Sequence, residues 1–217
     1  MNPSASSITD SLDLSQIQNL ARFRRRLGTE MSEILPNLYL GSLRDATDDE
    51  QLRKYKIKAI VGVHDMMNNH PRHEQLLVYR IKLSDCASEN IATHFFDAIK
   101  FIHQCRIRNE AVMIHCLAGV SRSATIVTAY VMAVCDISYN HAISYVSSKR
   151  PVVNPNFGFR MQLCKYRDKH VHEDRAKLRA LFGEDWDAQC ASDIKNVQEK
   201  IRGFSLLGNG LGRCELA

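Results

Sequence analysis

A short loop between two apolar segments constrains the fold of this chain more than any other feature. Residues 111–114 (AVMI) form an apolar run of strand length, and residues 124–134 (ATIVTAYVMAV) have the character of a buried helix. The loop between them, residues 115–123 (HCLAGVSRS), contains one glycine and one arginine. A buried strand that leads through a tight loop into a buried helix predicts an α/β fold.

The same loop carries Cys116 and Arg122 six positions apart, with Gly119 between them. Unpaired N–H groups and the helix dipole at the start of a helix favour an anion. They also favour a thiolate, so we expect the pKa of Cys116 to lie below the free-thiol value of about 8.5. The Arg122 guanidinium can hold two phosphate oxygens at once. The pattern predicts a phosphate-binding loop with a nucleophile at its base, although a lone buried cysteine is usually inert packing.

Other residues of the loop complete the expected site. We expect the hydroxyl of Ser123 to support the departing thiolate, and we assign His115 an orienting role and no chemistry. The backbone N–H groups from position 117 to Arg122 are expected to bind the phosphate oxygens. Besides Arg122, the residues that supply them are Leu117, Ala118, Gly119, Val120 and Ser121.

Residues 115–123 resemble the signature of the dual-specificity protein phosphatases, within the cysteine-based phosphatase superfamily. Residues 34–41 (ILPNLYLG) are similar to the opening strand of that domain, and residues 154–159 (NPNFGF), which begin with Asn154, to the segment that supports the phosphate loop. The resemblance covers residues 31–172 and is strongest to the small atypical members that lack a MAP-kinase-binding domain. It implies phosphoprotein substrates, MAP-kinase-pathway proteins among them, and a cysteinyl-phosphate mechanism without cofactor or metal.

That mechanism needs a proton donor for the leaving oxygen, and Asp85 is the candidate. It follows a strand-like segment, residues 77–83, and its position matches the general acid of the resembling family. Aspartate is also a preferred turn residue, so a purely structural role for Asp85 stays open. Glu89 is the competing acid. Asn90 is expected to cap the helix that follows.

The loop also indicates a substrate class. No lysine lies between Cys116 and Arg122, whereas relatives that act on phosphoinositides carry lysines there. The 85 residues that separate position 31 from Cys116 are too few for the phosphotyrosine-recognition insertion of the classical tyrosine phosphatases. The resulting shallow pocket would admit phosphoserine and phosphothreonine as well as phosphotyrosine. We therefore expect an active dual-specificity phosphatase; a catalytically weak phospho-binding module of this fold, or another cysteine-loop enzyme such as a sulfurtransferase, is the alternative.

Strands alternate with helices along the chain, which predicts a central, mostly parallel sheet of about five strands flanked by helices. We expect strands at residues 34–40, 57–63, 76–83 and 111–115, and helices at 48–55, 91–108, 122–135, 138–149 and 156–171. A chain of 217 residues, 45% of them hydrophobic, can bury one large core. We expect one catalytic domain at residues 31–175, able to fold without the mostly disordered tails at 1–30 and 176–217.

Composition limits the partners and the location. The arginines of residues 22–26 (RFRRR) are expected to be solvated, with docking on an acidic protein groove or an anionic surface as alternatives. A net charge of +5 is too diffuse to predict nucleic-acid binding. No apolar run reaches 18 residues, and Asn2 excludes myristoylation, so we expect no stable membrane anchor. The required free thiol favours the cytoplasm, with the nucleus as a second location.

Cys86 directly follows the proposed acid on a loop that must close over Cys116. An activated thiolate is oxidised first to a sulfenic acid, which a nearby thiol can trap as a disulfide. We therefore propose Cys86 as the resolving thiol, with Cys105 and Cys164 as the other candidates.

Overall fold

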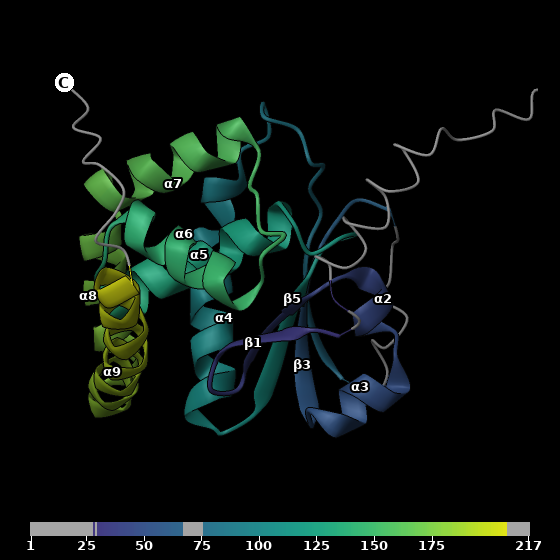
Figure 1. Cartoon of the computed structure of the whole chain (residues 1–217), viewed down its shortest axis with the longest axis horizontal. Coiled ribbons are helices and arrows are strands. Elements are labelled where there is room, and N and C mark those ends of the chain that lie inside the picture. The colour runs from purple at the N-terminus through teal and green to yellow at the C-terminus, as the bar shows by residue number, and fades with distance from the viewer. Residues whose placement is uncertain (1–27, 29, 67–75, 208–217) are drawn as a thin grey trace, which may run out of the picture.

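The computed structural model describes residues 28, 30–66 and 76–207; the arginine cluster at residues 22–26 lies outside them. A five-stranded sheet runs in the order β1-β2-β5-β3-β4, with β1 antiparallel to β2 and the other neighbouring strands parallel. The strands are β1 (Ser32–Leu35), β2 (Leu38–Gly41), β3 (Ile57–Val63), β4 (Leu77–Ile81) and β5 (Ala111–His115). The predicted mostly parallel sheet between helices is confirmed (Figure 1).

Helices cover both faces of this sheet. Figure 1 shows the short helices within residues 43–54 on one side and the longer ones on the other. In chain order they are α2 (Leu43–Ala46), α3 (Asp49–Lys54), the 3-10 turn η1 (Ile91–His94), α4 (Phe95–Ile107), α5 (Arg122–Cys135), α6 (Tyr139–Lys149), α7 (Phe157–Lys169), α8 (Val171–Phe182) and α9 (Glu184–Leu207). The expected helices are present, and α5 has the predicted bounds.

The central strand β5 supplies side chains to two hydrophobic clusters. Val112 and Ile114 belong to the larger cluster, which includes α4 and α5, whereas Ala111 and Met113 belong to the smaller cluster with α2 and α3. Successive side chains of a strand point to opposite faces of the sheet, so an entirely apolar strand serves both clusters. This explains why the AVMI run shows no polar alternation.

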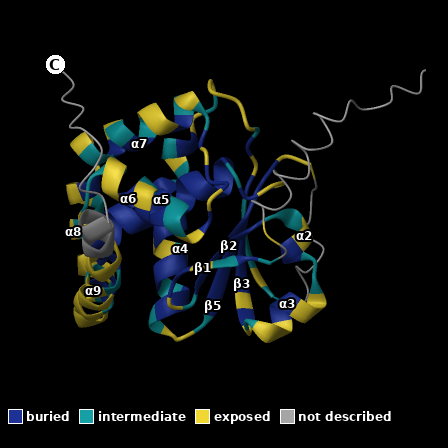
Figure 2. Cartoon of the chain, viewed as in Figure 1, coloured by how far each residue is buried: buried dark blue, intermediate teal, exposed yellow. Residues whose placement is uncertain are grey.

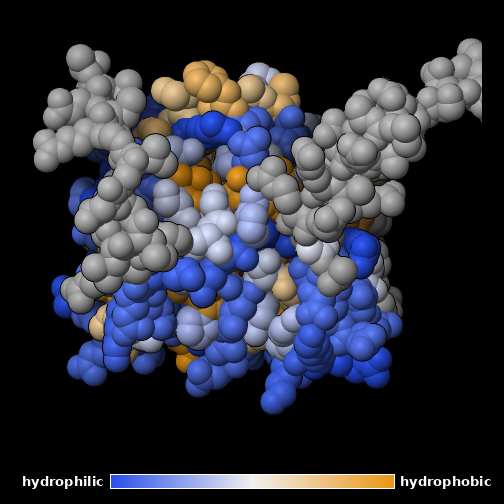
Figure 3. Space-filling model, viewed as in Figure 1, coloured by the Kyte–Doolittle hydropathy of each residue, from blue (hydrophilic) through white to orange (hydrophobic). Residues whose placement is uncertain are grey.

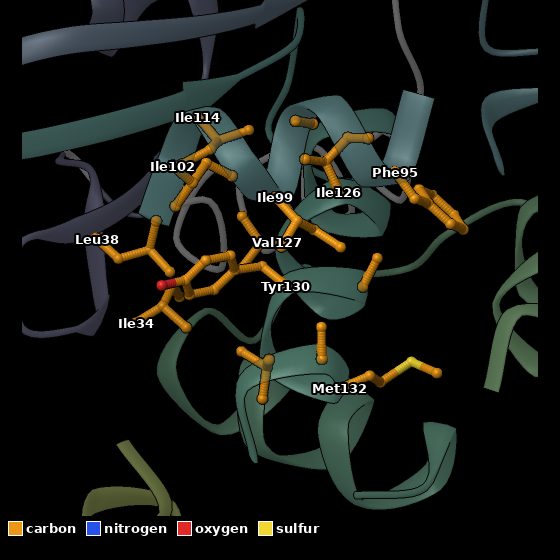
Figure 4. Close-up of a cluster of buried hydrophobic side chains, with 14 of the residues drawn as sticks. Ile34, Leu38, Phe95, Ile99, Ile102, Ile114, Ile126, Val127, Tyr130 and Met132 are labelled. Atoms are coloured by element: carbon orange, nitrogen blue, oxygen red, sulfur yellow. The ribbon is translucent and has the colours of Figure 1, made fainter. Parts of the chain in front are cut away.

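Helix α5 lies in the middle of the larger cluster, and each of its residues from Arg122 to Cys135 is buried (Figure 2). Figure 4 shows side chains of α4 and α5 gathered with Ile34, Leu38 and Ile114 of the sheet. A helix that is apolar all round must be covered on all sides. The N-terminal end of α5 is therefore held rigidly where β5 ends.

The expected strand at residues 34–40 is in fact two strands. Asn37 adopts a left-handed conformation, with φ of 62°, and the chain reverses between β1 and β2. Proline followed by asparagine is turn chemistry within an otherwise apolar run. The expected helix at residues 91–108 likewise begins with the tighter turn η1 before α4.

The prediction of a mostly disordered tail at residues 176–217 is wrong for Glu184–Leu207, which form a helix. Helix α8 continues to Phe182, and α9 follows after Gly183. Residues at helical spacing on α9 are buried against the core; they are Trp186, Cys190, Asp193 and Val197. The polar composition of the segment hid this face, because one of its buried positions is an aspartate. Residues 208–217 lie outside the described part of the chain.

Asp193 is paired with a buried arginine from α4. The Nη1 and Nη2 atoms of Arg106 donate to the two carboxylate oxygens of Asp193 at 2.6 and 2.8 Å. Arg106 also donates to the hydroxyl of Tyr130 at 2.8 Å and, through Nε and Nη2, to the carbonyl oxygen of Pro36. The pair joins α9 to α4, α5 and the β1–β2 turn.

Candidate active site

The loop after β5 closes around the sulfur of Cys116, whose residue is only 2% exposed. The Gly119 N–H and the Ser123 hydroxyl both donate to Sγ, each at 3.2 Å. Gly119 has a φ of 68°, and a Cβ atom there would lie 2.5 Å from the carbonyl oxygen of Gly41. Glycine is therefore required where this loop passes the end of β2.

Opposing effects act on the pKa of Cys116. Burial alone raises the pKa of the thiol. Hydrogen bonds from the Ser123 hydroxyl and from the N–H groups of Ser123, Val120 and Gly119 outweigh burial and hold the pKa below its ordinary value. The direction is the one expected from the sequence, and the start of α5 favours the thiolate further.

Arg122 is the first residue of α5 and is buried, with 5% exposed. Its Nη1 donates to the carbonyl oxygen of Leu83 at 3.2 Å, while Nε has no hydrogen-bond partner within the described chain. Carboxylates of Asp65 and Asp85 lie 3.7 and 3.6 Å from the guanidinium, too far for short hydrogen bonds. A guanidinium carries five N–H donors, so Arg122 retains capacity to bind an oxyanion.

Asp85 lies on the loop after β4, with 36% of its side chain exposed. Its Oδ1 accepts hydrogen bonds from the Ser121 hydroxyl at 2.7 Å and from Nδ2 of Asn156 at 2.9 Å. The chain thus brings Asp85 to the loop of Cys116, as the sequence predicted. Glu89, the competing acid, lies further along, where Gln162 of α7 donates to its backbone carbonyl.

The segment around Asn154 lies directly against the phosphate loop. The Asn154 N–H donates to the carbonyl oxygen of Val120 at 2.9 Å, and the Asn156 N–H donates to the Ser121 hydroxyl at 3.1 Å. Sequence reasoning named Asn154 but missed Asn156, whose side chain contacts Asp85. Its only signal was its place in the NPN motif.

Arg150 was also missed. It is 2% exposed, and its Nε and Nη2 donate to the carbonyl oxygens of Gly119 and Ala118 at 3.0 and 3.4 Å. Within a planar peptide the C=O and N–H groups point in opposite directions. By holding the carbonyl of Gly119 outward, Arg150 turns the N–H of Val120 towards the sulfur.

His115 is buried behind the loop, where Nδ1 lies 3.1 Å from the carbonyl oxygen of Cys116. Its ring centroid is 5.5 Å from that of His64. Burial, with the charges of Arg80 and Arg122, lowers the pKa of His64. His115 thus lies behind the loop, and its orienting role stays a prediction.

The cysteines differ in exposure. Cys86 is exposed, with Sγ 3.1 Å from the Ser88 hydroxyl, whose hydrogen bond lowers the pKa of the Cys86 thiol. Cys105 is buried and burial raises its pKa to about 11, whereas Cys164 is half-buried. A disulfide between Cys86 and Cys116 stays a prediction.

The arrangement combines a thiol of lowered pKa, N–H groups that donate to its sulfur, a guanidinium and a carboxyl group, which together suit phosphoryl transfer. Across residues 30–66 and 76–207 the structure contains no group of three or more His, Cys, Asp or Glu side chains placed to hold a metal ion. No helix in these ranges combines the length and apolar character needed to cross a bilayer.

Comparison with known proteins agrees with this geometry. Residues 38–169 match the family described as "Dual specificity phosphatase, catalytic domain". Dual specificity protein phosphatase 22 of Homo sapiens is 43% identical over 171 residues, covering 79% of this chain and 91% of the relative. Dual specificity protein phosphatase 15 of Mus musculus is 38% identical over 158 residues, covering 73% and 66%. The crystal structure of DUSP15 superposes with a TM-score of 0.69 at 38% identity, covering 72% of this chain and 99% of that one.

Proposed function

Because the chain belongs to the dual specificity phosphatase family, we propose that it hydrolyses phosphotyrosine and phosphoserine or phosphothreonine in proteins through a phosphocysteine on Cys116. The observation that carries the proposal is the environment of Sγ, which accepts hydrogen bonds from Gly119 and Ser123 and has a lowered pKa. A buried cysteine without a catalytic role would have a raised pKa, as Cys135 does.

In the first step the Cys116 thiolate attacks phosphorus, so that an S–P bond forms and the P–O bond to the substrate breaks. Asp85 donates a proton to the leaving oxygen, which departs as an alcohol or a phenol. Asp85 suits this role because its carboxyl is partly exposed and is oriented by Ser121 and Asn156.

In the second step water attacks phosphorus and Asp85 accepts its proton. The S–P bond breaks, inorganic phosphate forms, and the electron pair returns to the Cys116 sulfur. Ser123 supports this departure, since its hydroxyl lies 3.2 Å from Sγ and stabilises the developing thiolate.

Charge on the phosphoryl oxygens is balanced by the loop in both steps. We expect the N–H groups of residues 117–122 to bind these oxygens, since those of Gly119 and Val120 already donate to Sγ, and Arg122 to supply paired donors. Phosphoryl transfer depends chiefly on positioning and on such electrostatic stabilisation. Arg150 acts as a positioning residue because it holds the carbonyls of Ala118 and Gly119 away from the phosphate.

The substrates we propose are phosphoproteins with singly phosphorylated side chains, because residues 117–121 carry no charge to bind a second phosphate. The family resemblance adds MAP-kinase-pathway proteins to this proposal. We place the reaction in the cytoplasm, with the nucleus as a second location, because the six cysteines of the described chain are free thiols. The alternative, a weak phospho-binding module, is disfavoured because Cys116, Arg122 and Asp85 are all present in one site.

Turnover of an aryl phosphate and of a panel of phosphopeptides, in the presence of EDTA, tests the proposal. Wild type should hydrolyse both, vanadate should inhibit, and Cys116→Ser should abolish turnover while retaining phosphopeptide binding. Cys164→Ser, on the half-buried cysteine of α7, is the matched control and should remain active. Appreciable turnover by Cys116→Ser would overturn the mechanism.

A further inference from the structure

An apolar surface borders the site at the N-terminal end of α7. Phe157 and Met161 are 74% and 54% exposed, and Figure 3 shows apolar surface at the top edge of the molecule, where this end of α7 lies. Side chains four residues apart on a helix are neighbours, with Cβ atoms about 5–6 Å apart. We call these two residues the α7 shelf. Neither contributes to the core, which α7 contacts through Phe159, Leu163 and Tyr166.

The shelf begins one residue from the catalytic loop. Asn156, which precedes Phe157, donates its N–H to the Ser121 hydroxyl at 3.1 Å and its side-chain amide to Asp85 at 2.9 Å. Consecutive Cα atoms are about 3.8 Å apart, so the backbone of Phe157 lies beside the residue that contacts both Ser121 and Asp85. A protein that presents its phosphate to Cys116 must therefore pass close to the shelf.

The shelf is fixed relative to the acid loop. A Cβ atom on Gly158 would lie 2.0 Å from the carbonyl oxygen of Ala87, so α7 and this loop pack backbone against backbone. The Asn156 side chain accepts a hydrogen bond from the N–H of Phe159 at 3.0 Å and caps the helix. A preorganised apolar surface loses little entropy when it binds a partner.

The nearest charged residue turns away from the shelf. Arg160 lies between Phe157 and Met161 in sequence, but its Nε donates to the carbonyl oxygen of Pro155 at 2.7 Å and its Nη2 to the side chain of Asn154. The next residue in the Phe157–Met161 row is the exposed Lys165. The shelf is thus an uncharged strip of two side chains, suited to an apolar partner of similar size.

We propose that the α7 shelf binds an apolar side chain of the phosphoprotein substrate, within about three residues of the phosphorylated one, because an extended chain advances about 3.3–3.6 Å per residue. The proposal rests on the proposed phosphatase function and adds a substrate class to it. Phosphorylated segments with leucine, isoleucine, methionine or phenylalanine beside the phosphoresidue would be the preferred substrates. A substrate side chain is the occupant we propose because Phe157 directly follows Asn156, which contacts Ser121 and Asp85.

Two phosphotyrosine peptides of equal length and charge test the proposal with the full chain. One carries leucine and the other glutamine at the three positions on each side of the phosphotyrosine. We expect kcat/KM to favour the leucine peptide by about tenfold, in keeping with partial burial of one leucine side chain. Phe157→Ser and Met161→Ser should move this ratio towards one. Leu181→Ser, which alters another exposed apolar side chain on α8, should leave the ratio unchanged.

Two results would overturn the shelf: a wild-type ratio near one, or a ratio that neither Phe157→Ser nor Met161→Ser changes. Light scattering measures whether the chain forms dimers through the shelf. A dimer that Phe157→Ser dissociates would show that a second copy occupies the shelf, and the proposal would be wrong. Failure of the phosphatase function would look different, because neither peptide would be hydrolysed and Cys116→Ser would behave like wild type.

Discussion

Two buried arginines, Arg106 and Arg122, have opposite surroundings. Arg106 contacts both oxygens of Asp193 at 2.6–2.8 Å and also donates to Tyr130 and Pro36. Arg122 makes one backbone hydrogen bond at 3.2 Å, and its nearest carboxylates lie 3.6–3.7 Å away. The first guanidinium is saturated by its own protein, whereas Nε of the second has no hydrogen-bond acceptor among the described residues.

The difference separates structural charge from binding charge. A buried charge costs folding free energy unless it is paired and hydrogen-bonded. Full pairing around Arg106 therefore stabilises the packing of α9. Partial pairing around Arg122 leaves part of its desolvation uncompensated, and that deficit favours a phosphate.

The largest effect is expected at Arg122. Arg122→Lys should lower kcat/KM by about 10³-fold or more, because a point charge cannot replace a planar fork on phosphoryl oxygens. Its free energy of unfolding should stay close to wild type, since few hydrogen bonds are lost. Kinetics on a phosphopeptide and denaturant titration measure the two quantities. If Arg122→Lys unfolds easily but retains activity, Arg122 is a structural charge and not a binding charge.

At Asp85 the loss should depend on the leaving group. Asp85→Asn should slow hydrolysis of alkyl phosphates by about 10²–10⁴-fold, the usual contribution of general acid catalysis. An aryl phosphate with a good leaving group should lose less, because it needs less proton donation. Glu89→Gln is the control. If Glu89→Gln shows this pattern and Asp85→Asn does not, the acid is assigned wrongly.

The Arg106–Asp193 pair should affect stability and not chemistry. Asp193→Asn leaves a buried cation without its counter-ion and should cost about 3–5 kcal/mol of the free energy of unfolding. The double variant Arg106→Met with Asp193→Leu should recover much of that loss. Denaturant titration checks both. The expectation that residues 31–175 fold alone changes accordingly, because a chain ending there lacks Asp193 and should aggregate.

The smallest effect concerns pH. Burial, with the charge of Arg106, lowers the pKa of His103 to about 4, and its ring packs 4.6 Å from that of Trp186. Between pH 6.5 and this value the unfolded chain binds a proton that the folded chain does not, so stability is complete above pH 6.5 and decreases on acidification. The decrease should reach about 3 kcal/mol at most. In His103→Phe the free energy of unfolding should depend less on pH than in wild type. An unchanged dependence would show that His103 is not its source.

Local patterns predicted the parts of the molecule that depend on neighbours in sequence. The apolar run before Cys116 and the apolar helix after Arg122 determined the strand, the loop and the helix together. The position of Asp85 followed from the family resemblance. Asp65, Arg150 and other partners that only the fold brings to the loop had no comparable signal.

The prediction of disorder for the C-terminal tail was wrong for a related reason. Its buried face includes Asp193, and a carboxylate at a core position is interpreted as solvent-exposed until its cation is known. That cation, Arg106, is 87 residues earlier in the chain. Sequence periodicity detects apolar stripes, but it cannot identify a polar residue whose partner lies on another helix.

The distance in sequence between Arg106 and Asp193 also orders events during synthesis. The ribosome produces the sheet, α4 and the catalytic loop well before α9, and domains of a growing chain fold from the N-terminus. Until Asp193 emerges, the guanidinium of Arg106 lacks its counter-ion, and the surface that Trp186 covers is open to chaperones. The nascent phosphatase therefore completes its core only when its last described helix has left the exit tunnel.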